Sequence, residues 1–393
     1  MSPATWRLVL LVSAAHALVH ILELALPSAE VRMALDYGFD KDVSGWLAFS
    51  WRMPWGLAAI AAGWLTDHWG ADRTLAIFLV GCSLMCAIVG CYVALPVLFL
   101  VMVAMGTLAS IYHPAGLALI SHKTTPSDRP RALGIHGVFG SLGIGGAPLL
   151  AAMVFSFGLS WRSYYWLLSI LSLLLGLAFV ARWRRQSIGK QFDAKINERE
   201  DANVNWTSFR LICVYSFVQG FAYAAMMSFL PRYLERADVE IPLIGSQSTA
   251  TFLAGCVLLI GCVGQYVSGR IAAPRIMERQ LSVISILAAV PLAWMAVAAG
   301  GQRIAATALY ALLMFMLQPI YNSLVAKYTP ARRRSLCYGL TFAIGLGVGS
   351  LGSLFVGYSE SDLDTYGTLS ALAIFQGGIG WILWLRHRPQ QAV

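Results

Sequence analysis

The sequence predicts an all-α membrane protein with twelve transmembrane helices, arranged as two pseudo-symmetric six-helix bundles. Three observations lead to this fold class: the composition, a set of apolar stretches, and features repeated between the two halves of the chain. Of the 393 residues, 58% are apolar and 12% charged, whereas soluble domains average about 25% charged residues. Most of the surface is therefore expected to face lipid.

The apolar residues are grouped in stretches of the length that a membrane span requires. A helix needs about 20 apolar residues to cross a hydrocarbon core of about 30 Å. Because backbone groups in lipid must form their hydrogen bonds internally, stretches of this length are expected to be helices. Twelve such stretches are predicted, at 5–29, 44–66, 73–93, 97–121, 131–158, 163–183, 207–231, 246–268, 280–299, 304–328, 335–358 and 366–386.

The net charge of +9 is distributed unevenly over the loops between these spans. Most lysines and arginines fall on the side of the two termini, and Arg52 lies within a span. Only six lie on the opposite side: Arg32, Lys41, Arg162, Arg232, Arg236 and Arg303. Because basic loops stay in the cytoplasm, we expect an inner (plasma) membrane protein with both termini cytoplasmic. The basic charge then reflects topology, and no nucleic-acid partner is predicted.

The longest polar stretch divides the chain into equal halves. We predict an N-terminal six-helix bundle at 1–183, a cytoplasmic linker at 184–206 and a C-terminal six-helix bundle at 207–393. His113-Pro114 in the fourth span and Gln318-Pro319 in the tenth are each followed by a basic loop and then by a glycine-rich span. Duplicated halves of this kind, with a site between them, are a common plan of secondary transporters.

The loop after the second span reads Gly63-Trp-Leu-Thr-Asp67-His-Trp-Gly70-Ala-Asp-Arg73. It resembles the G-x-L-x-D-R-x-G-R-x-R motif of the major facilitator superfamily, which forms a latch on the cytoplasmic side. The resemblance implies the major facilitator fold, with a conformational role for Gly63, Asp67, Gly70 and Arg73. His68 and Ala71 depart from the motif, and the corresponding site after the eighth span has Ser268 in place of the acid.

The segment around the fourth and fifth spans resembles the fosmidomycin-resistance-like branch of that superfamily more narrowly. The matching residues are Tyr112-His113-Pro114-Ala-Gly116, Arg131-Ala-Leu-Gly134 and Gly140-Ser-Leu-Gly143. The glycine-rich spans resemble the family motif at the interface of the halves. Gly140, Gly143 and Pro148 are therefore expected to let helices of the two halves pack closely and slide past each other during transport. The branch contains exporters of small anionic or drug-like compounds, which favours export.

The first candidate site is in the first span, where His16, His20 and Glu23 share one helical face at i, i+4 and i+7. Burying an ionised group at bilayer depth costs about 2.5–3.5 kcal/mol, so Glu23 should face a partner or a water-filled cavity. Arg52 in the second span lies at a similar depth. We interpret the four as a proton-coupling site, in which protonation of Glu23 frees Arg52 for an anionic substrate. A static ion pair between the two helices is the alternative.

The second candidate group is His113 and His136, which fall in the cytoplasmic halves of the fourth and fifth spans. Pro114 removes a backbone donor and is expected to kink the fourth span. The two histidines are predicted to bind substrate or exchange protons on the inner side. Structural histidines that bond neighbouring carbonyls at a kink are the alternative.

The second half offers uncharged polar groups in place of charges. Tyr215, Gln219 and Tyr223 recur at i, i+4 and i+8 in the seventh span, and Gln318 and Asn322 lie in the tenth. Amides and phenols at these depths are predicted to hydrogen-bond a substrate. Polar contacts that hold helices together explain them equally well.

These features together predict a proton-coupled secondary transporter of a small organic solute, anionic or drug-like, with export slightly favoured over import. Its partners are expected to be the solute, protons and the bilayer, and the protein is expected to be a monomer. An importer of an organic anion or siderophore-like compound, or a non-transporting sensor or scaffold with this fold, are the alternatives. We expect no enzyme activity, cofactor or metal site, since no catalytic or nucleotide-binding motif is found in the sequence.

Overall fold

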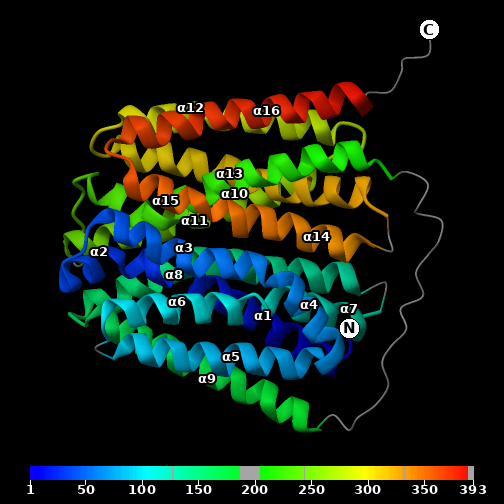
Figure 1. The fold of residues 1–393 in the computed structure, drawn as a ribbon, viewed down its shortest axis with the longest axis horizontal. Helices are drawn as coiled ribbons and strands as arrows, with labels where there is room; N and C mark the ends of the chain where they lie inside the picture. The colour runs from blue at the N-terminus through cyan, green and yellow to red at the C-terminus, as the bar shows by residue number, and fades with distance from the viewer. Residues whose placement is uncertain (92, 126–127, 186–203, 243, 331–332, 388–393) are drawn as a thin grey trace.

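The computed structural model describes the chain except residues 92, 126–127, 186–203, 243, 331–332 and 388–393, and every regular element in the described part is helical. The predicted all-α fold class is confirmed. The helices run roughly side by side along one direction (Figure 1). We call the end where α1 begins and α16 ends the termini end, and the opposite end, where α2 ends and α3 begins, the distal end.

The first six predicted spans correspond to nine helices, because three of these spans are interrupted. Their bounds are α1 Pro3–Glu23, α2 Ala25–Tyr37, α3 Lys41–Leu57, α4 Ala59–Trp69, α5 Ala71–Gly90, α6 Leu95–Ala109, α7 Tyr112–Lys123, α8 Arg129–Ser156 and α9 Trp161–Arg185.

The last six predicted spans include four uninterrupted helices, and the other two contain tighter or wider turns. Their bounds are α10 Trp206–Glu235, α11 Ser246–Ile271, α12 Met277–Val297, α13 Gln302–Tyr328, α14 Arg334–Phe342, the π-helical turn η3 Ala343–Gly347, the 3-10 turn η4 Val348–Ser350, α15 Leu351–Tyr358, the π-helical turn η5 Leu363–Gly367 and α16 Thr368–His387.

Eleven helical segments in the described part of the chain are long and apolar enough to cross a membrane, one fewer than predicted. The predicted span at 44–66 is the difference, and it corresponds to α3 and α4. This segment carries Arg52 and several tryptophans, which lower its hydropathy, yet α3 lies against α6 and α15 within the bundle. Its charge is therefore enclosed by other helices. The chain is a multi-pass membrane protein.

Two of the interruptions lie four residues before a proline. The pyrrolidine ring clashes with the carbonyl group four residues earlier and supplies no N–H to it. Pro27 accounts for the break between Glu23 and Leu24, and Pro114 accounts for the break at Ser110, where α6 ends. The predicted kink at Pro114 is thus confirmed.

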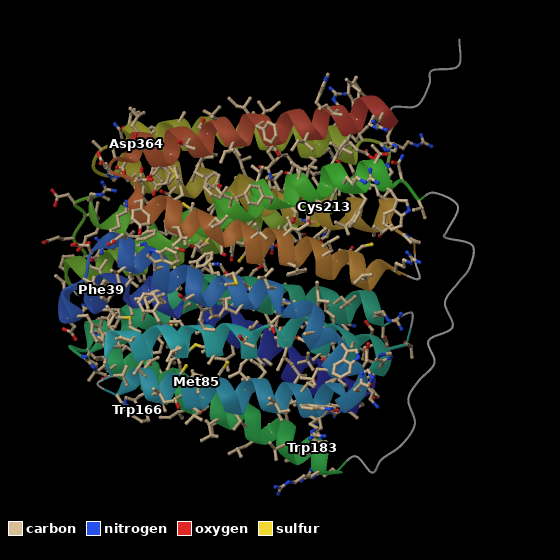
Figure 2. The ribbon with its side chains drawn as sticks, viewed as in Figure 1. Phe39, Met85, Trp166, Trp183, Cys213 and Asp364 are labelled. Carbon is tan, nitrogen blue, oxygen red and sulfur yellow. The ribbon has the colours of Figure 1, made fainter. Side chains whose placement is uncertain are left out.

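Exposed apolar side chains cover the outside of the bundle. On the outer helix α9, Trp166 and Trp183 lie toward the distal and termini ends respectively (Figure 2). Leu174 on the same helix is 60% exposed, and Leu100 on α6 is 70% exposed. Such side chains fit a surface that contacts lipid rather than water.

The buried apolar residues form one cluster within 8–179 and two further clusters built mainly from α10 to α16. We call α1–α9 the first group and α10–α16 the second group. The predicted linker, 184–206, lies almost wholly outside the described residues, so the division into domains at these residues stays a prediction.

Polar contacts join the two groups at the distal end. Arg232 on α10 donates two hydrogen bonds to the Glu30 carboxylate on α2, at 2.7 and 3.1 Å, and Ser44 Oγ donates to the same carboxylate. Lys41 Nζ bonds the Ser359 carbonyl at 3.0 Å. These contacts hold the first and second groups together where α2 and α3 meet α10 and α15.

Candidate functional site

The carboxylate of Glu23 is the centre of a buried polar network in the middle of the bundle. Arg52 Nη1 donates to Glu23 Oε1 over 2.7 Å, and the Tyr223 hydroxyl donates to the same oxygen over 2.9 Å. His20 Nδ1 lies 2.7 Å from the other oxygen, Oε2. Glu23 and Arg52 are each 2% exposed. The predicted pair is therefore formed, and Tyr223 links it to the second group.

One nitrogen of the Arg52 guanidinium makes no hydrogen bond to the described residues. Its Nη2 atom is buried and has no hydrogen-bond acceptor in the described part of the chain. The guanidinium lies 5.4 Å from the centre of the Tyr223 ring. A buried charged donor left without an acceptor costs free energy, so an oxygen that reached Nη2 would be bound favourably.

His16 and His136 meet through stacking and through the main chain. Their ring centres are 3.9 Å apart, and His16 Nδ1 lies 2.7 Å from the His136 carbonyl oxygen. The Tyr112 hydroxyl uses its hydrogen to donate to the Val12 carbonyl over 2.8 Å. The 2.9 Å contact between this hydroxyl oxygen and His136 Nε2 is therefore assigned as a hydrogen bond donated by Nε2. Tyr112 thus fixes the side chain of His136.

His113 completes the cluster from α7. Its ring centre is 5.6 Å from that of His16 and 5.6 Å from that of His20. Trp55 on α3 and Phe342 on α14 lie at 5.9 and 5.3 Å from it. From the sequence alone, His113 and His136 are predicted as a candidate site separate from His16 and His20. The structure brings all four histidines together, so the separation into two sites is wrong.

The breaks in α1–α2 and α6–α7 help to position this cluster. Glu23 is the last residue of α1, and His113 is the second residue of α7, beside the two proline-induced breaks. Interrupted helices at bilayer depth are tolerated where they line a site or are enclosed by protein. The prolines therefore determine where two of the site residues lie.

Most of the polar residues predicted in the second group lie away from Glu23. Tyr215 is fully buried and bonds Ser285 at 2.9 Å, and Gln219 accepts from Gln376 over 2.6 Å. Both contacts stay within the second group. The i, i+4, i+8 spacing predicts one common role for the seventh span, but only Tyr223 reaches the network.

Gln318 and Asn322 also lie outside the network. Gln265 on α11 donates to the Gln318 side chain and accepts from Ser141 on α8, so it connects the two groups. The Asn322 carbonyl accepts from Tyr338 over 2.7 Å. The Gln318 contact corresponds to the alternative in which polar side chains hold helices together, whereas the Asn322 contact is made by its main chain and leaves the role of its side chain a prediction.

Two of the predicted glycines serve contacts within the first group rather than between the groups. A Cβ atom at Gly140 would lie 2.4 Å from His16 Cε1, and one at Gly143 would lie 2.2 Å from the Ala17 carbonyl oxygen. On α8 the close approach to the second group is instead made by Gly145, with Gly255 on α11, and Gly56 on α3 meets Gly347 in the same way. Gly140 therefore makes room for a histidine of the site, and Pro148 lies farther along the same helix, α8.

The motif from Gly63 to Arg73 covers the end of α4, a turn at Gly70 and the start of α5, and in the described part of the chain Asp67 forms no latch contact. Gly70 has a φ of +83°, which favours glycine, and Arg73 lies over the rings of Trp69 and Trp183 at 4.7 and 5.4 Å. Asp67 is exposed, and no hydrogen bond or ion pair is found for it among the described residues. Gly63 lies beside Pro114.

Sequence reasoning missed several buried groups near predicted span boundaries. Glu30, Asp72 and Glu278 lie one or two residues outside their predicted spans but are buried, at 3%, 6% and 2% exposed. Glu278 pairs with Lys327 at 2.5 Å. Tyr112 precedes His113 directly in the sequence, and its hydroxyl group in the middle of an apolar span is the signal that points to a role in the site.

Comparisons with known proteins are consistent with this arrangement. The profile of the Major Facilitator Superfamily matches residues 10–353. The puromycin resistance protein pur8 of Streptomyces alboniger is 29% identical over 203 residues, which is 49% of this chain and 38% of that protein. The match therefore spans well under half the length of this relative.

Solved structures with the same fold cover nearly the whole chain. A variant of peptide transporter POT in complex with alafosfalin has a TM-score of 0.77 at 14% identity, over 98% of this chain and 95% of that one. A bacterial homologue of the human lysosomal transporter Spinster, inward-facing and unoccupied, has a TM-score of 0.73 at 14% identity over 100% of both chains. At these identities the likeness shows the fold alone. Because the superfamily profile covers most of the sequence, the chain belongs to the Major Facilitator Superfamily of membrane transporters.

Proposed function

We propose that this protein is a proton-coupled secondary transporter that moves a small organic solute, anionic or drug-like, across the inner membrane by alternating access. The observation that carries the proposal is the Glu23 carboxylate, which binds Arg52 of the first group and Tyr223 of the second group at once. A proton on this carboxylate changes the contacts within the site and between the groups together. That combination is what coupling requires.

Protonation of Glu23 removes the charge that holds Arg52. His20 lies beside the oxygen that would take the proton, since its Nδ1 is 2.7 Å from Oε2. Once Glu23 is neutral, the attraction to the Arg52 guanidinium falls and Oε1 holds its two donors less strongly. The link from α1 to α10 is then weakened, and the groups are free to separate at this level.

The released Arg52 is suited to an anionic group of the solute. Its Nη2 already lacks an acceptor among the described residues, and release of Nη1 would present two adjacent donors. A carboxylate or phosphonate matches this fork with two parallel hydrogen bonds. The Tyr223 ring lies beside this fork, and the Trp55 and Phe342 rings flank His113 in the same cluster and supply apolar surface for the rest of the solute.

Export is favoured over import by the relative that is named a puromycin resistance protein. We also propose that both termini and the 184–206 linker are cytoplasmic, because the basic loops are concentrated at the termini end. Tags fused to the two ends and tested for protease access in intact cells check this topology. A tag that is cleaved from outside would contradict it.

The coupling is tested by transport in vesicles that contain the purified protein. A pH gradient is imposed, and accumulation of puromycin and of a phosphonate anion such as fosmidomycin is followed for wild type, Glu23→Gln and Glu240→Gln. Glu240 is an exposed acid in a loop and serves as the matched control. We expect wild type and Glu240→Gln to accumulate a solute with the gradient, and Glu23→Gln to lose that dependence.

Each outcome bears on one part of the proposal. Gradient-driven accumulation by Glu23→Gln equal to wild type would refute coupling through Glu23. Accumulation in the direction opposite to export would establish the importer instead. If neither compound nor a wider panel of organic anions and cations moves or binds, a sensor or scaffold with this fold is the better description.

A further inference from the structure

Three histidines of the cluster converge on one point from two helices. His16 and His20 lie on α1 and His113 lies on α7, and each offers a ring nitrogen within 4.8 Å of the other two. His16 is buried, and His20 and His113 are partly exposed. Three converging imidazoles exceed what proton exchange with a single carboxylate requires.

The hydrogen bonds of two histidines fix which nitrogen is free. A carbonyl oxygen only accepts, so His16 Nδ1 must carry the proton that it shares with the His136 carbonyl. The Glu23 carboxylate likewise accepts from His20 Nδ1. In the neutral rings, Nε2 of both residues is then an unprotonated electron-pair donor.

This pattern is the one that metal-binding histidines show in proteins. A ligand histidine usually donates its second ring N–H to a carboxylate or a backbone carbonyl, which fixes its tautomer and orientation. His20 donates to a carboxylate and His16 to a carbonyl. His113 has no hydrogen bond among the described residues, so either of its ring nitrogens is available.

We propose that His16, His20 and His113 bind one divalent transition-metal ion of the zinc class. Imidazole nitrogens suit zinc, cobalt, nickel and copper, whereas calcium and magnesium prefer oxygen ligands. Three protein ligands leave a fourth position of a tetrahedral ion open to water or to an oxygen of the solute. The sequence alone predicts no metal site, because His113 on α7 joins His16 and His20 only in the fold.

Small side-chain rotations complete the coordination. Zinc–nitrogen bonds of about 2.0–2.1 Å place tetrahedral ligand nitrogens about 3.4 Å apart, closer than the 4.8 Å limit within which they lie now. Gly140 leaves the His16 ring in place beside α8. The Glu23 carboxylate accepts from Nδ1 of His20, on the side of the ring away from the ion, and so makes Nε2 a stronger electron-pair donor.

The first test is equilibrium binding to the full-length protein in detergent, purified through a tag without histidine. Zn²⁺ is titrated by calorimetry, and Co²⁺ is followed by its visible absorption, which reports four-coordinate binding. We expect one ion per chain. X-ray absorption of the zinc-loaded wild type should show three imidazole ligands at about 2.0–2.1 Å. No binding at micromolar metal, or fewer than two imidazole ligands, would overturn the proposal.

Variants then locate the ion. His20→Ala and His113→Ala should each weaken binding by more than about 100-fold, since loss of even a supporting partner costs about 10–100-fold. His113→Gln, which keeps more of the side-chain volume, replaces His113→Ala if the latter does not elute as a single species. His122→Ala is the matched control, because His122 is an exposed histidine near the end of α7, the helix that carries His113. Equal loss in this control would refute the assignment.

His68→Ala is a second control for a general histidine effect. His68 is an exposed histidine on α4, outside the cluster, and its Nδ1 lies 2.8 Å from the Trp64 carbonyl. We therefore expect binding within a few-fold of wild type. These measurements need no gradient and no solute: an ion that binds without any proton-driven transport would leave this inference standing and refute the proposed function.

Discussion

The two groups of helices differ in what they bury at their centres. In the first group an ion pair and four histidines lie together, at Glu23, Arg52 and the rings around His16. The second group buries hydroxyl and amide pairs, such as Tyr215 with Ser285 and Gln376 with Gln219. The difference teaches that the charge-dependent part of the site is confined to one group, with Tyr223 as the contribution of the other.

The corresponding helices also break at different places. Pro114 interrupts the fourth span, whereas α13 continues through Pro319 from Gln302 to Tyr328. Conversely, α8 is continuous, and its glycine-rich counterpart contains the π-helical turn Ala343–Gly347. The interruption in the first group lies beside the ionisable residues, and the one in the second group packs against α3.

Removing Arg52 is expected to have the largest effect on the difference between the two groups. Arg52→Ala leaves Glu23 buried without its charged partner, which costs about 3–5 kcal/mol of unfolding free energy. Reversible unfolding in mixed detergent measures the change. Arg236→Ala, which removes a pair with Asp362 from a side chain that is 54% exposed, is the control and should cost about 0–1 kcal/mol. Equal losses would mean that the central pair is not enclosed as described.

Removing the hydroxyl of Tyr223 measures what the second group contributes to the network around Glu23. Tyr223→Phe deletes a hydrogen bond to a charged acceptor and is expected to cost about 1.5–3 kcal/mol. Tyr215→Phe deletes a neutral bond within the second group and should cost about 0.5–1.5 kcal/mol. The same unfolding assay compares them, and a smaller effect at Tyr223 would contradict the link between the groups.

A methyl group at Gly140 tests the packing beneath the histidines. Gly140→Ala places a carbon against the His16 ring and is expected to cost about 1–3 kcal/mol by overpacking. Gly146→Ala on the same helix meets open space and should be neutral or stabilising, since alanine favours helix over glycine by about 1 kcal/mol. Thermal unfolding in detergent checks both, and similar midpoints would show that His16 moves aside freely.

The helices could be predicted because length and hydropathy are local properties. Composition gave the fold class, and the spacing of His16, His20 and Glu23 gave one face of the site. The pairing of Glu23 with Arg52 followed from their similar depths in neighbouring spans. Proline chemistry correctly placed the break before His113.

The assembly of the four histidines could not be predicted from the sequence. It depends on the rotation of α1 against α8, which the absence of a side chain at Gly140 allows, and on the position of α7 after its break. Neither is encoded in the periodicity of one helix. Glu30 was missed for a simpler reason: α2 continues to Tyr37, beyond the apolar stretch, and its acids find partners on other helices, Glu30 with Arg232 on α10 and Asp36 with Trp161 on α9.

In the proposed alternating access, the pair of Glu30 and Arg232 would also set a rate. Any motion that separates α2 from α10 at the distal end must break both hydrogen bonds between Arg232 and Glu30. It must also expose to water the Glu30 carboxylate, which is only 3% exposed in this structure. Opening of the distal end would then be an activated step. The Arg232 side chain is 31% exposed, so dissolved ions reach it and screen the pair, and added salt should lower this barrier.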